Sequence, residues 1–296
     1  MNRFPLSFAV LSALHAQGLL QARSGGLKKA MASLDLGISR QEVHIELDGI
    51  SLGTGLLIDW EQLQVIVDSE NGCFKVLNNT IEEIRVYSES TRRTFSLFPT
   101  ADAPALFISG FTMHRLKDIS PRRAAREMIR AAAPIRGRVL DTATGLGYTA
   151  IVAARSAAAV ISIELDPGSL AMARANPWSQ ELFKHPGISL IAGDSSEEIV
   201  KFADEYFSVI IHDPPNLSLA GDLYGEAFYK QAWRVLAGNG RMFHYLGDPK
   251  SALGGRVTKG VVKRLQAAGF RRIIPKPFVH GVLACKCTFL YIWNTL

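Results

Sequence analysis

The feature that most constrains the fold is a change of hydrophobic period near residue 120. From Pro121 onward, short apolar runs alternate with stretches of helical period, and the first helix is predicted over 121–133 with proline in its first turn. Such alternation is typical of βαβ units, in which helices cover both faces of a mostly parallel sheet. The predicted strands are 139–140, 160–163, 188–191, 209–211, 241–243, 272–274 and 288–293. The sequence therefore predicts a doubly wound, mostly parallel, seven-stranded α/β domain over 113–296.

A smaller N-terminal domain is predicted over 1–112. The apolar stretch 4–20 is interrupted by Pro5, His15 and Gly18, which favours an amphipathic helix over a secretory signal. Runs rich in β-branched and aromatic residues follow, separated by turn residues such as Asn71-Gly72, and they predict a largely antiparallel sheet. The predicted strands of this domain are 43–47, 64–67, 84–87 and 94–97.

Composition limits the setting in which the chain works. With 48% hydrophobic residues in 296, the chain can bury cores for two domains. No apolar segment reaches the roughly 20 residues that a membrane span needs, so no membrane association is predicted. Cys73, Cys285 and Cys287 form no Cys-x-x-Cys pair, which favours a reducing, cytoplasmic location and predicts no structural metal.

The positive charge is unevenly distributed along the chain. The net charge is +6, and residues 115–138 hold eight Lys or Arg against two acidic residues. The chain has no acidic residue after Asp248, whereas this part carries Lys250, Arg256, Lys259, Lys263, Arg264, Arg271, Arg272, Lys276 and Lys286. Clustered positive charge suits a polyanion, because each neutralised phosphate releases counterions. We expect RNA as the partner, although charge alone does not separate RNA from DNA, a membrane surface or a solvated basic face.

A glycine-containing turn follows the first predicted strand of the α/β domain. Asp141-Thr-Ala-Thr-Gly-Leu-Gly147 joins that strand to a predicted helix at 148–155. Glycines in such a turn allow the backbone to approach a ligand closely. We therefore predict a binding turn that includes Asp141, Ala143, Thr144, Gly145 and Gly147.

Acidic residues end the next two predicted strands. Glu164, followed by Leu165, ends the second strand about 20 residues further on, where an acid can bind both hydroxyls of a ribose. Asp194, followed by Ser195, ends the third strand, where a side chain can reach an adenine amino group. These strand ends share one rim of the sheet, where open α/β folds bind ligands. NAD would account for the turn and for Glu164, but Asp194 favours a different adenosine cofactor.

The fourth strand ends in Ile211-His-Asp-Pro-Pro-Asn216. With this motif, residues 120–295 resemble the Rossmann-like S-adenosylmethionine-dependent methyltransferases that methylate planar amino groups through Asp/Asn-Pro-Pro-aromatic. Residues 210–224 also resemble a group of archaeal predicted RNA methyltransferases. The resemblance implies that Asp141, Gly145 and Gly147 hold the methionine part of the cofactor, Glu164 its ribose and Asp194 its adenine.

The resemblance further implies that Asp213, Pro214, Pro215 and Asn216 hold the amino nucleophile. A base amino group is a poor nucleophile because its lone pair is delocalised into the ring. Hydrogen bonds to the Asp213 carboxylate and the Pro214 carbonyl would localise that lone pair, and two prolines would stiffen the loop. Neither a metal nor a covalent intermediate is required. The alternative is that Asp-Pro-Pro merely ends a strand with a stiff turn.

Two positions depart from the family pattern. Ala143 stands where the family usually has its first glycine, and Asn216 replaces the aromatic residue that stacks on the target base. Stacking would then come from elsewhere, with Tyr224, Phe228 and Tyr245 as candidates. His114 is a candidate acid–base group, although a structural histidine is favoured, and His212 and His244 are expected to be packed in the interior.

The predicted activity is methylation of an exocyclic amino group of a base in RNA, in rRNA or tRNA, with cytosine slightly favoured. One alternative is a protein glutamine amide methyltransferase, although those enzymes usually carry Asn-Pro-Pro-Tyr. Another is a polyamine synthase-like aminopropyltransferase, which would group acids around a cationic amine, and a third is a non-catalytic RNA-binding relative. The sequence leaves open the number of methyl groups, the role of the N-terminal domain and the oligomeric state.

Overall fold

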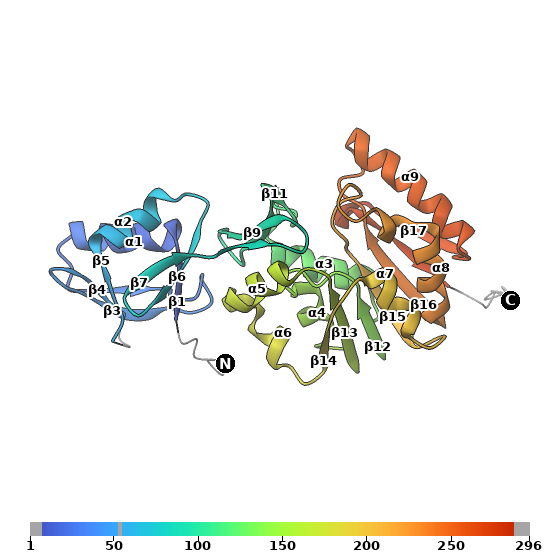
Figure 1. Ribbon diagram of the computed structural model, residues 1–296, viewed down its shortest axis with the longest axis horizontal. Helices are drawn as coiled ribbons and strands as arrows, with labels where there is room; N and C mark the ends of the chain where they lie inside the picture. Colours follow the sequence, from blue (N-terminus) through green and yellow to red (C-terminus); the bar gives the residue numbers. More distant parts are fainter. Residues whose placement is uncertain (1–7, 53–54, 287–296) are drawn as a thin grey trace, which may run out of the picture. The chain divides into compact units, whose positions relative to one another are not determined.

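The computed structural model describes residues 8–52 and 55–286, and the chain divides into two compact units (Figure 1). Unit 1 is Met1–Arg122 together with Asp166–Phe183, and unit 2 is Arg123–Leu165 together with Lys184–Leu296. No pattern in the sequence indicated that 166–183 would group with the N-terminal residues. The predicted domains 1–112 and 113–296 stay a prediction, and each unit is described below by itself.

Unit 1 contains helices and three antiparallel sheets, with strand orders β1-β6-β7, β2-β3-β4-β5 and β11-β10-β9-β8 in the described residues. Its core includes Leu11, Leu19, Val43, Ile58 and Ile66. The elements are β1 (Ala9–Ser12), α1 (Ala13–Ser24), β2 (Lys29–Ala32), β3 (Gln41–Ile45), β4 (Gly49–Ser51), β5 (Leu57–Asp59), α2 (Trp60–Asp68), β6 (Cys73–Leu77), β7 (Thr80–Glu83), β8 (Arg85–Ser88), β9 (Arg93–Phe98), β10 (Ala105–Ile108), β11 (Phe111–Thr112), α5 (Pro167–Ala175) and η1 (Pro177–Ser179).

The predicted strand at 64–67 is wrong, because these residues lie within helix α2. Asp59 caps the helix by accepting a hydrogen bond from the Gln62 backbone N–H at 2.7 Å, and the Gln62 side chain accepts one from the Asp59 N–H. This capping box fixes the start of a helix locally. Leu63 and Ile66, one turn apart, are both fully buried. The cap and the buried helical face outweigh the strand preference of Val65, Ile66 and Val67.

The predicted helix at 4–20 is only partly right. Residues 1–7 lie outside the described part of the chain, β1 occupies Ala9–Ser12, and α1 begins at Ala13. All four residues of β1 are buried, and they pair with Cys73–Val76 of β6. A short run buried on every side shows no periodicity that separates strand from helix, so pairing with a distant strand decides its structure.

The described part of unit 2 forms a seven-stranded sheet of order β14-β13-β12-β15-β16-β18-β17. The five strands from β14 to β16 are mutually parallel, and β18 lies antiparallel between β16 and β17. The strands are β12 (Arg138–Asp141), β13 (Ala159–Glu164), β14 (Ile188–Ala192), β15 (Phe207–His212), β16 (Leu236–Tyr245), β17 (Arg272–Lys276) and β18 (Gly281–Cys285). Six predicted strands are confirmed, whereas the predicted seventh, 288–293, lies outside the described residues, and β18 completes the observed sheet.

Helices alternate with these strands along the chain, as predicted. They are α3 (Pro121–Ala132), α4 (Tyr148–Ala153), α6 (Gln180–Lys184), α7 (Ser195–Glu198), η2 (Ile199–Lys201), η3 (Gly221–Tyr224), α8 (Glu226–Val235), α9 (Ala252–Ala267) and η4 (Pro277–Val279). Residues 180–183 of α6 belong to unit 1. The core of unit 2 includes Leu140, Phe207, Ile210, Met242 and Leu265, and it positions the strand ends that carry the predicted site. Among the described helices, none combines the length and the apolar character that crossing a membrane requires.

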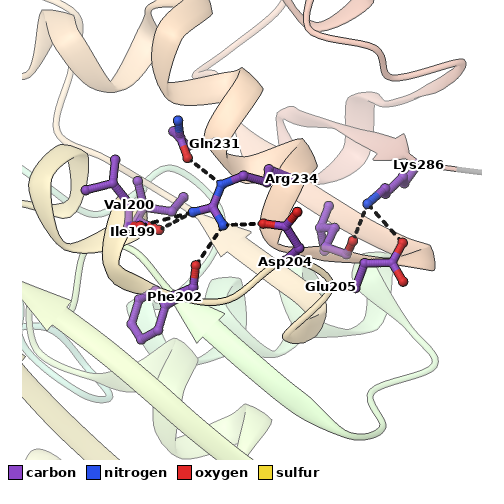
Figure 2. Close-up of polar contacts among 9 residues, drawn as sticks. Ile199, Val200, Phe202, Asp204, Glu205, Gln231, Arg234 and Lys286 are labelled. Carbon is purple, nitrogen blue, oxygen red and sulfur yellow. Dashed lines mark hydrogen bonds and ion pairs between the residues drawn. The ribbon is translucent and has the colours of Figure 1, made fainter.

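At the amino end of β15, the Arg234 side chain binds the segment that precedes the strand. Figure 2 shows Arg234 of α8 donating hydrogen bonds to the backbone carbonyls of Ile199, Val200 and Phe202 and to the Asp204 carboxylate. Beyond these, its Nε donates to Gln231 at 2.7 Å. The Arg234 guanidinium thus donates to several carbonyls at and just after 199–201, the end of a short helical segment.

Lys286 makes a second set of buried contacts at this end of the sheet. Its side chain is only 4% exposed, and its Nζ donates to the Leu236 carbonyl at 2.7 Å and contacts Glu205 at 3.4 Å (Figure 2). The ammonium also lies 4.2 Å from the centre of the Trp233 ring, a cation–π contact. Lys286, predicted as part of a basic surface, is therefore engaged inside unit 2.

Candidate active site

The predicted site residues of unit 2 lie at or just beyond the carboxyl ends of neighbouring strands. Asp141 of β12 is level with Ser162 of β13 and with Ile211 of β15. Two residues beyond that level, β13 ends at Glu164 and the chain after β15 reaches Asp213. Since parallel strands present their carboxyl ends at one edge, the sheet brings these acids to a common rim, as predicted.

The turn after β12 has the backbone conformation that requires glycine. Gly145 and Gly147 have φ values of +52° and +77°, in the left-handed region that residues with a Cβ adopt with difficulty. A Cβ placed on Gly145 would meet no heavy atom within 4 Å, so conformation rather than crowding demands glycine there. Ala143 is half-buried and Thr144 is buried, with the Thr144 hydroxyl 2.7 Å from that of Ser162. The turn therefore leaves space beside its backbone for a ligand.

Asp141 is fully buried and held by hydroxyl groups. Its carboxylate accepts hydrogen bonds from Ser162 Oγ at 2.8 Å and from Thr149 Oγ1 at 3.2 Å. Burial raises the pKa of this carboxyl to about 7, although the two hydroxyl bonds lower it, and the charges of Asp213 and Glu164 raise it further. Three carboxyls thus share one electrostatic environment, which favours a cationic ligand group beside Asp141.

Glu164 links the second strand to the glycine turn. Its Oε2 accepts a hydrogen bond from the Gly145 backbone N–H at 2.8 Å. The side chain is half-buried, and the next residue, Leu165, has 56% of its surface exposed. The carboxylate therefore stands directly beside the turn, and Leu165 offers an apolar surface next to it.

Asp194 and Ser195 begin helix α7 after the third strand. Asp194 Oδ1 accepts hydrogen bonds from the backbone N–H and the hydroxyl of Ser196, both at 2.7 Å, so the carboxylate caps the helix. Ser195 is buried, and its hydroxyl donates to the Thr142 carbonyl at 2.6 Å. This bond ties the start of α7 to the turn after β12.

Asp213 differs from Asp141 in having no hydrogen-bond donor among the described residues. It is half-buried, and burial raises the pKa of its carboxyl to about 7. Pro214 is buried, and the Pro215 carbonyl accepts a hydrogen bond from the Tyr224 hydroxyl at 3.1 Å. The loop is thus stiffened by two prolines and anchored at Pro215, while the Asp213 carboxylate keeps its accepting capacity.

Asn216 is exposed, and its side chain accepts a hydrogen bond from the Ser218 hydroxyl at 2.6 Å. Its backbone carbonyl accepts hydrogen bonds from the N–H groups of Leu219 and Ala220. The described contacts make Asn216 the first residue of a turn, and its predicted role in binding the nucleophile stays a prediction.

Two buried histidines under Asp213 have a more definite role than packing alone. The Leu223 carbonyl, 2.9 Å from His212 Nε2, can only accept a hydrogen bond, so this nitrogen carries the proton. His212 Nδ1 then accepts from the Thr142 hydroxyl at 2.7 Å. Burial lowers the pKa of His212 to about 4, so the ring is neutral near pH 7. The side chain next to Asp213 therefore connects the glycine turn to the segment that follows the Pro-Pro loop.

His244 lies opposite His212 on β16, with the ring centres 4.3 Å apart. Its Nε2 is 2.9 Å from the Tyr229 hydroxyl, and its Nδ1 is 3.3 Å from the His212 carbonyl. Burial lowers its pKa well below the ordinary value. These contacts hold the backbone just before Asp213. The only signal in the sequence was the position of each histidine at the end of an apolar strand.

His114 belongs to unit 1. Its Nδ1 accepts a hydrogen bond from the Leu106 backbone N–H at 3.1 Å, and burial lowers its pKa to about 4. The favoured interpretation, a structural histidine, agrees with this contact. Within the described residues, no group of three or more His, Cys, Asp or Glu side chains is arranged to hold a metal ion.

Solved structures of spermidine synthases are similar to this chain. A spermidine synthase bound to the transition-state analogue AdoDATO is 21% identical, over 71% of this chain and 77% of its own, with a TM-score of 0.56. Spermidine synthase from Thermotoga maritima is 22% identical, over 71% of this chain and 76% of its own, with a TM-score of 0.53. The chain therefore has the same Rossmann-like α/β fold as spermidine synthase.

No protein-family model matches the sequence. Uncharacterized protein MJ1233 of Methanocaldococcus jannaschii is 47% identical over 194 residues, which span 65% of this chain and 67% of that protein. The chain belongs to the family of MJ1233.

Proposed function

We propose that this protein transfers a methyl group from S-adenosylmethionine to an exocyclic amino group of an unpaired base in RNA. The observation that carries this proposal is Asp213: a half-buried carboxylate without a donor among the described residues, in a stiff Pro-Pro loop, on the same rim as three other acids. Such a group is placed to accept the hydrogens of a planar amino group.

The residues around the glycine turn fit S-adenosylmethionine. The open space beside Gly145 admits a ligand against the backbone, and Asp141 suits the ammonium of the methionine part, since a nearby cation would stabilise its charged form. Glu164 would hold the ribose hydroxyls and Asp194 the adenine amino group. When bound, the cofactor would supply an electrophilic methyl group on its sulfonium.

Asp213 and the Pro214 carbonyl would each accept one hydrogen of the target amino group, which turns its lone pair toward the methyl group. After transfer the nitrogen carries an extra proton, and the Asp213 carboxylate, whose pKa is about 7, can receive it near neutral pH. Tyr224 holds the Pro215 carbonyl and His212 holds the strand end, so both acceptors are oriented before the substrate arrives.

RNA is proposed as substrate because the amino group must be reachable, and single-stranded or flipped bases expose theirs. Exposed cations of unit 2, among them Arg256, Lys259 and Lys263 of α9, supply charge for phosphate contacts. Cytosine is the base we expect, in rRNA or tRNA. A cytoplasmic location is part of the same proposal.

Aminopropyl transfer is a second candidate, favoured by the fold shared with two spermidine synthases. That reaction uses decarboxylated cofactor and an aliphatic diamine. A diamine has no delocalised lone pair, so it gains little from two oriented acceptors.

The test supplies radiolabelled S-adenosylmethionine with total RNA from cells that lack the protein. Labelled nucleosides are then identified by mass spectrometry. We expect label in one amino-methylated nucleoside, none with Asp213→Asn, and unchanged labelling with Glu226→Gln, an exposed acid paired with Lys230. Label in protein instead of RNA would point to a glutamine amide. Product formed from decarboxylated cofactor and a diamine, with RNA unlabelled, would establish aminopropyl transfer.

A further inference from the structure

The structure excludes two of the three aromatic residues that were candidates to stack on a base. Tyr224 and Phe228 are only 5% and 3% exposed, and both pack on the ring of His212. A ring must present an open face to stack on a base. Asn216, where an aromatic was expected, is exposed but not aromatic. If RNA binds at this rim, its bases must stack on aromatic groups elsewhere.

Strand register identifies other aromatic residues at the level of Asp213. His212 pairs with His244, so Asp213 and Tyr245 follow at the same level. Tyr245 pairs with Gly281 of β18, which in turn pairs with Lys276 of β17. The turn that joins β17 to β18, residues 277–280, therefore projects from the rim that carries Asp213.

This turn is held firmly against the sheet. The His280 N–H donates to the Pro277 carbonyl at 3.2 Å, and the His280 carbonyl accepts from the Leu246 N–H at 2.8 Å. Pro277 fixes the first position of η4, and the His280 ring stacks on Tyr245 with centres 6.3 Å apart and planes 22° apart. A side chain on this turn is thus presented from a rigid base.

Phe278, in the middle of the turn, is 92% exposed. The large apolar side chains exposed in the described part of unit 2 are those of Leu165, Val200, Leu217 and Phe278, and Phe278 is the aromatic one. Lys276, a half-buried cation two residues earlier, lies at the start of the same turn. An exposed ring beside a cation is the combination with which proteins bind single-stranded nucleic acid.

We infer that Phe278 stacks on an unpaired base next to the base that is methylated, and that this contact selects single-stranded RNA. Gly281 is two strand spacings from the level of Asp213, a distance of about 10 Å. A nucleotide next to the one whose amino group contacts Asp213 is therefore within reach of Phe278. This inference rests on the proposed function and adds to it the recognition of flanking bases.

The test measures binding of two fluorescent RNA nonamers by anisotropy. One is oligocytidylate, and the other keeps only its central cytosine and has abasic ribose elsewhere. Wild type should bind the first more tightly, because only that oligonucleotide has flanking bases. Phe278→Ala should weaken binding of oligocytidylate about tenfold and leave the abasic oligonucleotide unchanged, while Phe278→Tyr should keep the wild-type affinity.

Two control variants separate stacking from charge and from exposed apolar area. Lys276→Gln should weaken both oligonucleotides equally and reduce the dependence on salt, as expected of a phosphate contact. Val200→Ala, at an exposed residue near the amino end of β15, should change neither. Equal affinity of wild type for the two oligonucleotides, or an equal effect of Phe278→Ala on both, would overturn the inference.

The methylation assay distinguishes this inference from the function on which it rests. If Asp213→Asn abolishes RNA labelling while Phe278→Ala leaves oligocytidylate binding intact, the stacking inference fails alone. If wild type labels no RNA nucleoside, the proposed function fails.

Discussion

The two ends of the unit 2 sheet use charged side chains in opposite ways. At the amino end of β15, Arg234 and Lys286 donate to backbone carbonyls and to the carboxylates of Asp204 and Glu205 (Figure 2). At the carboxyl end, Asp213 has no donor in the described structure, and burial raises its pKa to about 7. The charges at the amino end are paired within the protein, whereas at the carboxyl end the Asp213 carboxylate accepts no hydrogen bond from a described residue, unlike Asp141, Glu164 and Asp194.

This difference separates residues that stabilise the fold from those that bind a ligand. A buried cation with several acceptors gains little from a further partner, but its removal leaves those acceptors unpaired. A half-buried carboxylate without donors costs stability in the absence of a ligand and gains most when one arrives. Substitutions at the two ends should therefore affect different measurements.

The largest effect is expected from Asp213→Asn. The amide cannot take a proton and accepts more weakly, so we expect kcat for RNA methylation to fall by about 1,000-fold. Binding of S-adenosylmethionine, followed by calorimetry, should stay within a factor of about three. The melting temperature at pH 8 should not fall, because the change removes a poorly solvated charge. A lower melting temperature with unchanged kcat would show that Asp213 stabilises the fold and does not take part in the reaction.

Arg234→Ala should have its effect on stability. The carbonyls of Ile199, Val200 and Phe202 lose their donor, and we expect the free energy of unfolding to fall by about 2–4 kcal/mol. Urea denaturation measures this change, with Asp204→Ala, at the exposed partner, as the milder control. The kcat of folded protein should remain within about twofold of wild type, and a large fall in kcat would show that the two ends are coupled.

Glu164→Gln tests cofactor binding at the carboxyl end. Glutamine can still accept from the Gly145 N–H but lacks the charge, so we expect the Kd for S-adenosylmethionine to rise by about 10- to 100-fold. The matched control is Glu197→Gln on the exposed surface of α7, which should leave the Kd unchanged. An unaltered Kd for Glu164→Gln would remove this residue from the proposed site.

The dependence of stability and of kcat on pH tests the Asp141 and Asp213 carboxyls together. The pKa values of Asp141 and Asp213 are raised from 3.8 to about 7, so the folded state binds more protons than the unfolded state between these values. Stability should therefore fall as pH rises from about 4 to 7 and level off above it. The kcat should rise over the upper part of this range, because only ionised Asp213 accepts the amino hydrogens. Full activity at pH 5 would contradict this prediction, and thermal melting across the range measures its stability part.

Local signals predicted much of unit 2 and less of unit 1. The strands of the large sheet are apolar runs flanked by helical periods, so their identity depends on residues close in sequence. In unit 1, the run Val65-Ile66-Val67 has strand propensity but lies in a helix fixed by the Asp59 cap and by burial of Leu63. Short apolar runs of this kind take the structure that tertiary packing favours.

The sequence by itself determined which acids end which strands, and therefore that Asp141, Glu164, Asp194 and Asp213 meet at one rim. Parallel strands leave no other edge for their carboxyl ends, whereas the strand order that sets which acids are neighbours is known only from the sheet itself. Only the tertiary structure decided how each acid is solvated and bonded. Asp141 is enclosed by hydroxyl groups and Asp213 is not, because Ser162 and Thr149 reach the first and no described donor reaches the second. Burial and hydrogen bonding depend on residues distant in sequence, and these set the pKa of a carboxyl and the ligand that it can bind.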